Sequence, residues 1–136
     1  MTTLIVTKEL EDELDVLQDE QPNLSDAAWL LLTALYENKD LLDHLHVPST
    51  HPFHSPVFEV KLFSEAHQDG FNIYILKFKD LNDIPKDHRI FLGFNAQRDI
   101  YYGLAITDRE YSYLTEHWAY RDLLARYEKC QIPKYA

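Results

Sequence analysis

The sequence is poor in cysteine, in glycine and in long apolar runs, and each shortage excludes a class of protein. One cysteine, Cys130, among 136 residues cannot form an internal disulfide, which argues against a disulfide-stabilised secreted protein. Three glycines and no visible repeat exclude collagen-like and low-complexity chains. The longest apolar stretch, residues 27–36, is far shorter than the roughly 20 residues that span a bilayer. Because the N-terminal MTTLIVTKELEDELD has no basic region, we expect no secretory signal, no membrane partner and a cytoplasmic location.

What the chain does have is enough apolar content for a folded core, and an uneven distribution of charge. Hydrophobic residues make up 46% and aromatic residues 13%, which fits one folded domain over residues 1–136. The net charge of −10 opposes non-specific binding to nucleic acid. Residues 1–70 hold 14 acidic and 3 basic residues, whereas residues 71–136 hold 9 acidic and 10 basic residues. A small cationic site is therefore still compatible with the C-terminal half.

The first part of the chain, residues 1–46, has the pattern of a strand and a helical hairpin. A short strand is expected at residues 2–6, and apolar residues at helical spacing predict helices over residues 8–19 and 23–37. Thr7 can cap the first helix, and Pro22 ends it. The short link between the two predicts an antiparallel pair, and a further short helix is expected after Asn38.

The second part, residues 57–107, has the pattern of a sheet. Strands are predicted at residues 57–63, 71–79, 88–94 and 100–107, with a polar connection at 64–70 and a hairpin loop at 95–99. Small Gly103 and Ala105 predict close packing of a helix on the last strand. A final helix is expected at residues 115–129, within a C-terminal segment 114–130. We therefore expect a two-layer α+β fold: an N-terminal helical hairpin packed on a twisted, mainly antiparallel sheet, with a closing C-terminal helix.

Four histidines fall within residues 44–54, a density that invites a metal-binding interpretation. The segment has no cysteine partner and no i,i+4 histidine pair on a helix, and prolines interrupt it. We expect no metal ion there. The chain also has no phosphate-binding loop, dinucleotide motif or nucleophile triad, so no cofactor is expected.

Several segments together resemble one known family. The N-terminal LIVTKELEDELDVL, the pair YILKFKD and HRIFLGFN, and the later YYGLAITDREYSY are similar to the RelE/ParE superfamily of bacterial type II toxins. The ending EHWAYRDLLARYEK is similar to the longer YhaV-like members. The resemblance implies a cytoplasmic toxin that inhibits translation by metal-independent mRNA cleavage, acts on ribosome-bound mRNA and is neutralised by a small antitoxin protein.

The resemblance also implies a basic strand that binds phosphate. Lys77 matches one lysine of that strand. The second lysine position is Ile75 here, although Lys79 lies two residues beyond Lys77 on the same strand face. Lys77 and Lys79 are therefore the candidate RNA-binding residues.

The catalytic candidates follow from the same resemblance. Arg89 matches the arginine that opens the next strand, and Arg109 matches the arginine after the last strand. The family's terminal tyrosine falls near Thr115 here, so Tyr111 or Tyr113 would take its place. RNA cleavage by 2′-hydroxyl attack needs cations at the phosphate and groups that transfer protons.

A second interpretation belongs to another class of function. A member of this fold can act without catalysis by binding another protein, either as a gyrase inhibitor or as a toxin that has lost its activity. The acidic N-terminal half favours this interpretation, whereas the basic residues near the strand ends favour RNA cleavage.

Overall fold

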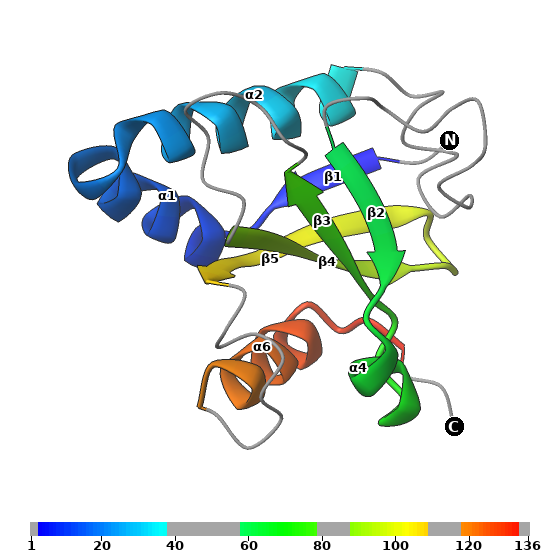
Figure 1. Cartoon of the computed structure of the whole chain (residues 1–136). Helices are drawn as coiled ribbons and strands as arrows, with labels where there is room; N and C mark the ends of the chain where they lie inside the picture. The colour runs from blue at the N-terminus through cyan, green and yellow to red at the C-terminus, as the bar shows by residue number, and fades with distance from the viewer. Residues whose placement is uncertain (1–2, 38–57, 79–87, 109–117, 134–136) are drawn as a thin grey trace.

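The computed structural model describes residues 3–37, 58–78, 88–108 and 118–133 of the chain. In chain order the elements are β1 (Thr3–Val6), α1 (Lys8–Glu20), α2 (Pro22–Glu37), β2 (Phe58–Leu62), α4 (Ser64–Gln68), β3 (Ile73–Phe78), β4 (His88–Asn95), β5 (Ile100–Asp108) and α6 (Trp118–Lys129). Figure 1 shows the α1–α2 hairpin on one side of the sheet and α6 on the other. The expected α+β class, with a helical hairpin, a mainly antiparallel sheet and a closing helix, is confirmed.

The sheet has five strands in the order β1-β5-β4-β3-β2. β1 runs parallel to β5, and the other neighbouring pairs are antiparallel. Phe91 lies opposite Ala105 and Leu92 lies opposite Gly103, so Leu104 is the extra residue of a β-bulge in β5. β1, the first strand of the chain, therefore forms one edge of the sheet, and β5, the last strand, lies next to it.

The start of α1 is fixed against β5 by Thr7 and Gly103. The Thr7 side chain accepts a hydrogen bond from the Leu10 N–H, as expected of a helix cap. The Thr7 hydroxyl and N–H both donate to the Gly103 carbonyl, at 2.7 and 3.1 Å. A Cβ atom at Gly103 would lie 2.7 Å from Leu10 Cδ2, so any larger residue would force the Leu10 side chain of α1 to move. The close helix packing predicted from the small residues of this strand is confirmed at Gly103.

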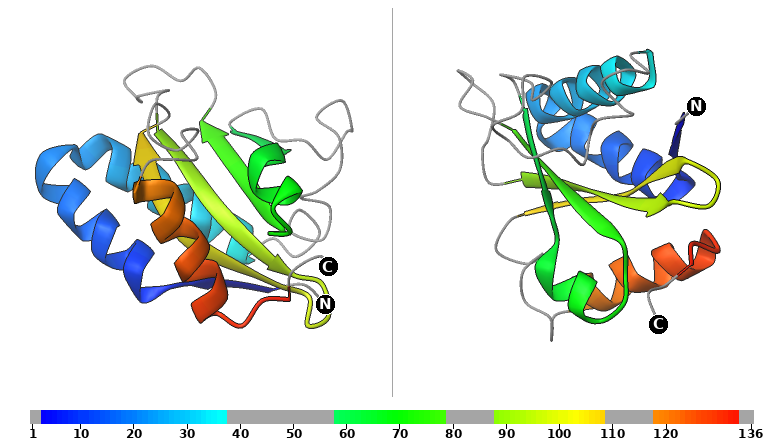
Figure 2. Two further views of the ribbon diagram at one scale, coloured as in Figure 1. Left: turned by 90° about the horizontal axis from the view of Figure 1, so that it is seen from below. Right: turned by 90° about the vertical axis from the view of Figure 1, so that its right-hand side faces the viewer.

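Two separate hydrophobic cores lie on the two faces of the sheet. Figure 2 shows the helices that cover these faces, the α1–α2 hairpin on one and α6 on the other. The first lies between the α1–α2 hairpin and the sheet and includes Leu10, Leu14 and Ile90. The second lies between the sheet and α6 and includes Phe91, Leu123 and Tyr127. The fold thus has three layers, not the two expected from the sequence. The closing helix covers the opposite face because Phe91 of β4, together with Ile73 and Ile75 of β3, presents a second apolar surface there.

The short helix α4 replaces the polar connection expected at residues 64–70. Phe63 and Ala66 are fully buried in the second core, and this anchors one turn of helix below the sheet. The Phe63 ring lies 5.4 Å from Phe91 and 5.7 Å from Tyr120, between centroids. Gly70 ends the turn with a φ of 94°, a conformation that favours glycine.

Other expectations fall partly beyond the described residues. The four predicted strands of residues 57–107 are observed with boundaries shifted by a few residues at most. The final helix is described from Trp118, so residues 114–117 of its expected segment lie outside the described part. The short helix expected after Asn38 and the histidine-rich segment 44–54 also lie outside it. Among the described helices, none combines the length and the apolar character needed to cross a membrane.

Candidate functional site

The candidate basic residues of β3 and β4 meet at one end of the sheet. Lys77 lies directly opposite Arg89 in the β3–β4 register, and Arg89 lies opposite Thr107 of β5. On its other side, Lys77 lies opposite Glu59 of β2. Directly opposite residues of antiparallel strands have Cα atoms about 4.5–5.5 Å apart. Two sequence positions that are twelve residues apart are thus neighbours in space.

Arg89 is the candidate catalytic residue whose side chain the structure describes. It is 6% exposed, and its Nη1 donates to the His88 carbonyl at 3.0 Å. Arg89 alternates along β4 with Phe91, which belongs to the core on the α6 side of the sheet. A guanidinium held there is shielded from water, which strengthens its interaction with any charge that reaches it.

The other four candidates, Lys79, Arg109, Tyr111 and Tyr113, lie outside the described residues. Their place in the sequence is informative all the same. Lys79 directly follows Phe78, the last residue of β3, and Arg109 directly follows Asp108, the last residue of β5. β3 and β5 end, and β4 begins, at the same end of the sheet. Lys79 and Arg109 therefore follow, in the sequence, strands that end next to the Lys77–Arg89 pair.

A second charged constellation, which the sequence analysis missed, joins the two helical layers around the edge of the sheet. Arg126 of α6 donates to both carboxylate oxygens of Glu13 of α1, at 2.8 and 3.1 Å. Its Nη1 also donates to the Leu104 carbonyl at 2.9 Å, while Glu13 Oε1 accepts from the Ile106 N–H at 3.2 Å. β1 is paired with β5 through Gly103, so this ion pair satisfies the backbone of β5 just beyond the end of β1.

The electrostatics of Arg126 agree with a structural role. Burial disfavours its charged form, but the hydrogen bond and charge of Glu13, together with Asp122 and Glu9, outweigh that effect and raise its pKa above the ordinary value. Glu13 and Arg126 are separated by 113 residues, so no spacing rule could have found the pair.

Two further titratable groups have raised pKa values without forming a reactive centre. Burial, followed by a hydrogen bond to Asp69 at 2.7 Å, raises the pKa of Tyr120 well above its usual range. Burial and the nearby charge of Glu9 raise the pKa of the Cys130 thiol, so this cysteine stays protonated at neutral pH and is a poor nucleophile. Within the described ranges, no group of three or more histidine, cysteine or acidic side chains is arranged to hold a metal ion.

Comparisons of the chain with protein-family models, with curated proteins and with solved structures gave no match. The site is therefore interpreted from its own chemistry. Two basic residues on adjacent strands, with a further lysine and arginine next in sequence, can bind a phosphodiester and offset the charge that builds up when it is attacked.

Proposed function

We propose that this protein is the toxin of a type II toxin–antitoxin system and cleaves mRNA with a RelE/ParE-like domain. The observation that carries the proposal is the Lys77–Arg89 register pair at the end of the sheet where β5 leads into Arg109. The order of a strand, a helical hairpin, antiparallel strands and a final helix supports the same family.

In the proposed reaction, the 2′-hydroxyl of a ribose attacks the adjacent phosphate and the bond to the 5′-oxygen breaks. The products are a 2′,3′-cyclic phosphate and a 5′-hydroxyl, so no external reactant is consumed. Lys77, Arg89 and Arg109 stabilise the extra negative charge of the pentavalent phosphate, and Lys79 binds the neighbouring backbone. Tyr111 or Tyr113 transfers the proton at the 2′-hydroxyl or at the leaving oxygen.

The proposed setting is the cytoplasm of a bacterium, with ribosome-bound mRNA as substrate and a small antitoxin protein as inhibitor. A ribosome that presents the mRNA would remove the need for a strongly basic RNA-binding surface, which a net charge of −10 disfavours.

A second function, inhibition by protein binding without catalysis, is favoured by the burial of Arg89. A catalytic arginine must reach the reacting phosphate, and 6% exposure leaves little of its surface to do so. In this case the domain would act by contact with a target such as gyrase, and Lys77 and Arg89 would have a structural role in the sheet.

The two functions are separated by inducing the protein in a bacterial host and by adding the purified protein to a translation extract. RNA cleavage predicts growth arrest and mRNA fragments that end in 2′,3′-cyclic phosphate. Arg109→Ala should lower the cleavage rate by about 10²–10³-fold, the usual loss on removing one transition-state cation or donor. Growth arrest with intact mRNA would favour the binding function, and unimpaired growth with intact mRNA would contradict the toxin proposal.

Matched variants keep the test specific. Arg98→Ala removes an exposed arginine from the β4–β5 hairpin and should leave cleavage unchanged. Arg89→Lys retains a positive charge at the buried position, and its thermal unfolding shows whether a loss of activity reflects the site or the fold. Full activity of both Arg109→Ala and Arg89→Lys would refute the assigned mechanism.

A further inference from the structure

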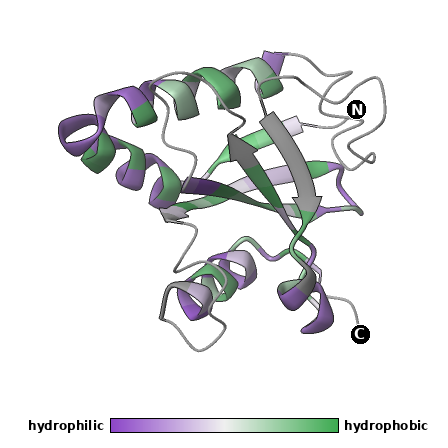
Figure 3. Ribbon diagram, viewed as in Figure 1, coloured by the Kyte–Doolittle hydropathy of each residue, from purple (hydrophilic) through white to green (hydrophobic). Residues whose placement is uncertain are grey.

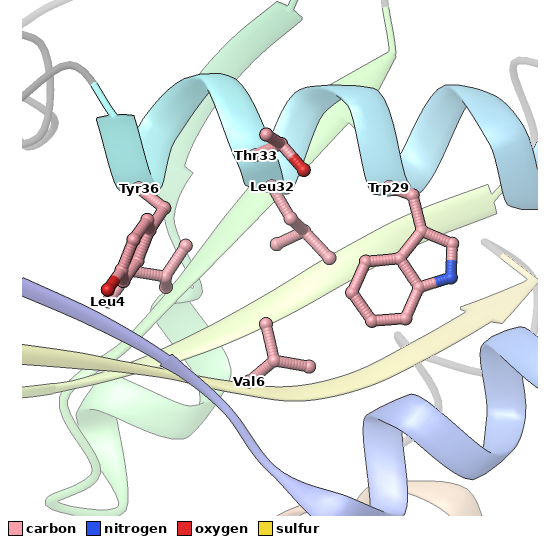
Figure 4. A pocket seen from close by; sticks show the side chains of 6 residues that line it. All are labelled: Leu4, Val6, Trp29, Leu32, Thr33 and Tyr36. Carbon is pink, nitrogen blue, oxygen red and sulfur yellow. The ribbon is translucent and has the colours of Figure 1, made fainter.

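An apolar groove lies between β1 and α2, at the edge of the sheet. Six residues line it, and Figure 4 shows how their side chains converge: Leu4, Val6, Trp29, Leu32, Thr33 and Tyr36. Its volume is about 210 Å³. The groove opens beside β1, whose partner strand within the described residues is β5 on its other side.

The backbone of β1 has hydrogen-bonding groups directed toward this opening. The Thr3 and Thr7 N–H groups donate to the Asp99 and Gly103 carbonyls, so they face β5. Because N–H directions alternate along a strand, those of Leu4 and Val6 face away from β5. The same two residues line the groove, so the edge offers backbone donors and acceptors next to an apolar floor.

The apolar surface of helix α2 extends past β1, the edge strand of the described sheet. Trp29, Thr33 and Tyr36 share one side of α2 at helical spacing, next to the buried row that includes Ala28 and Leu35. Tyr36 is 56% exposed, and on the opposite face of β1 Ile5 is 43% exposed. The helix is thus wide enough to cover one more strand than the described sheet contains.

The net charge of the N-terminal segment that contains the groove favours a basic strand. Residues 3–37 carry nine acidic residues and one lysine. Figure 3 shows hydrophilic and hydrophobic segments alternating along α1. Within the described residues, Glu9, Asp12 and Glu13 of α1 form ion pairs, but Lys8 is the one basic residue among residues 3–37, so nine acids less one lysine leave this segment with an excess of eight negative charges. A second copy of the chain docked edge to edge would bring two such surfaces together, whereas a basic segment would be attracted.

We infer that β1 and the groove beneath α2 bind an extended, lysine- or arginine-bearing segment of a partner protein, which adds to the sheet as a strand beside β1. Alternate apolar side chains of the segment, about 6.8 Å apart, enter the groove next to Leu4 and Val6. The intervening basic side chains face outward and lie in the field of the acidic N-terminal half.

The test uses the full chain and a seven-residue peptide of alternating lysine and valine, with amide hydrogen exchange followed by NMR. When nine-tenths of the protein is bound, exchange of the Leu4 and Val6 amides should slow about tenfold, because it proceeds through the free tenth. The Thr7 amide, already bonded to Gly103, serves as the internal reference. A peptide of alternating glutamate and valine should bind at least about tenfold more weakly.

A pair of variants on α2 locates the binding surface. Thr33 and Ala34 are neighbouring exposed residues, and Thr33 lines the groove whereas Ala34 does not. Thr33→Arg should weaken peptide binding about tenfold or more, while Ala34→Arg, with the same added charge, should change it less than about twofold. Unchanged exchange at Leu4 and Val6 with peptide bound, equal effects of the two variants, or no binding at millimolar peptide would overturn the inference. Protection of both amides by self-association, without peptide, would identify a second copy as the occupant and overturn it as well.

Discussion

Replacing Glu13 by alanine should destabilise the protein far more than its partly exposed position on α1 would suggest. Glu13 accepts two charge-assisted hydrogen bonds from Arg126 and one from the Ile106 N–H. The substitution leaves Arg126 with Asp122 and the Leu104 carbonyl, and it leaves the edge of β5 without that acceptor. Hydrogen bonds to charged groups contribute about 1.5–3 kcal/mol when buried.

Partial exposure lowers that figure. The side chains are 30% exposed for Glu13 and 15% for Arg126, so we expect a total loss of about 2–3 kcal/mol for Glu13→Ala, well below the sum for three fully buried hydrogen bonds. For a chain of 136 residues, each kcal/mol corresponds to a change in Tm of about 3–4 °C, so the expected shift is about 6–12 °C. Urea unfolding gives the free energy directly, and hydrogen exchange should show faster opening at the Ile106 amide.

Two controls on the same helix distinguish the ion pair from general loss of acidic charge. Glu9 contacts Lys129 at 3.5 Å, and Lys129 is 74% exposed, so Glu9→Ala should cost less than about 0.5 kcal/mol. Glu11→Ala, at an exposed position, should have an equally small effect. In a double-mutant cycle with Arg126→Met, the coupling energy to Glu13 should be about 1–2 kcal/mol. Equal losses for Glu13→Ala and Glu11→Ala would refute the role assigned to the pair.

Two further predictions concern the core on the α6 side. Tyr120→Phe removes the hydrogen bond to Asp69 and should cost about 1 kcal/mol at pH 7. Because folding raises the pKa of Tyr120, its stabilising effect is complete below the unfolded value of about 10 and is lost as the pH rises above it. Between pH 9 and 11 the free energy of unfolding should therefore fall less steeply with pH for Tyr120→Phe than for the wild type. Parallel curves would contradict the role given to the Tyr120–Asp69 hydrogen bond. Gly93→Ala places a Cβ 2.7 Å from Ile132 Cδ1 and 3.1 Å from two more side-chain atoms, and overpacking should cost about 1–3 kcal/mol in urea unfolding. Gly103→Ala, with one such close contact, should cost less, and the reverse order would contradict this account.

The strands and helices were predictable because their apolar periodicity is local. Residues 71–79 alternate as a strand does, and the i,i+3 and i,i+4 leucines of α1 and α2 mark one helical face each. The third layer was missed although a signal for it exists. Ile90, Phe91 and Leu92 form a continuous apolar run in β4, which is typical of a strand covered on both faces.

The candidate site was predictable only in part. The Lys77–Arg89 pair follows from two strands joined in antiparallel order, so a correct strand assignment brings the two residues together. Arg89 lies on the face of the sheet that α6 covers, and nothing in the local pattern of β4 predicts its burial. The Glu13–Arg126 pair and the groove beside β1 depend on how both helical layers meet the sheet edge, and no local pattern encodes that.

The two proposed surfaces lie at opposite ends of β5, and this makes them separable in experiments. β1 pairs with Ile100–Gly103 at the start of the strand, whereas Arg89 lies opposite Thr107 near its end. The four residue steps from Gly103 to Thr107 correspond to about 14 Å, nearly twice the Debye length of about 8 Å at physiological salt. The effect of removing a positive charge near the Lys77–Arg89 pair is therefore largely screened at the groove. Loss of RNA cleavage in Arg109→Ala with unchanged peptide binding would support two independent sites. A matching loss of both would mean that one surface, organised by the whole sheet, serves RNA and protein alike.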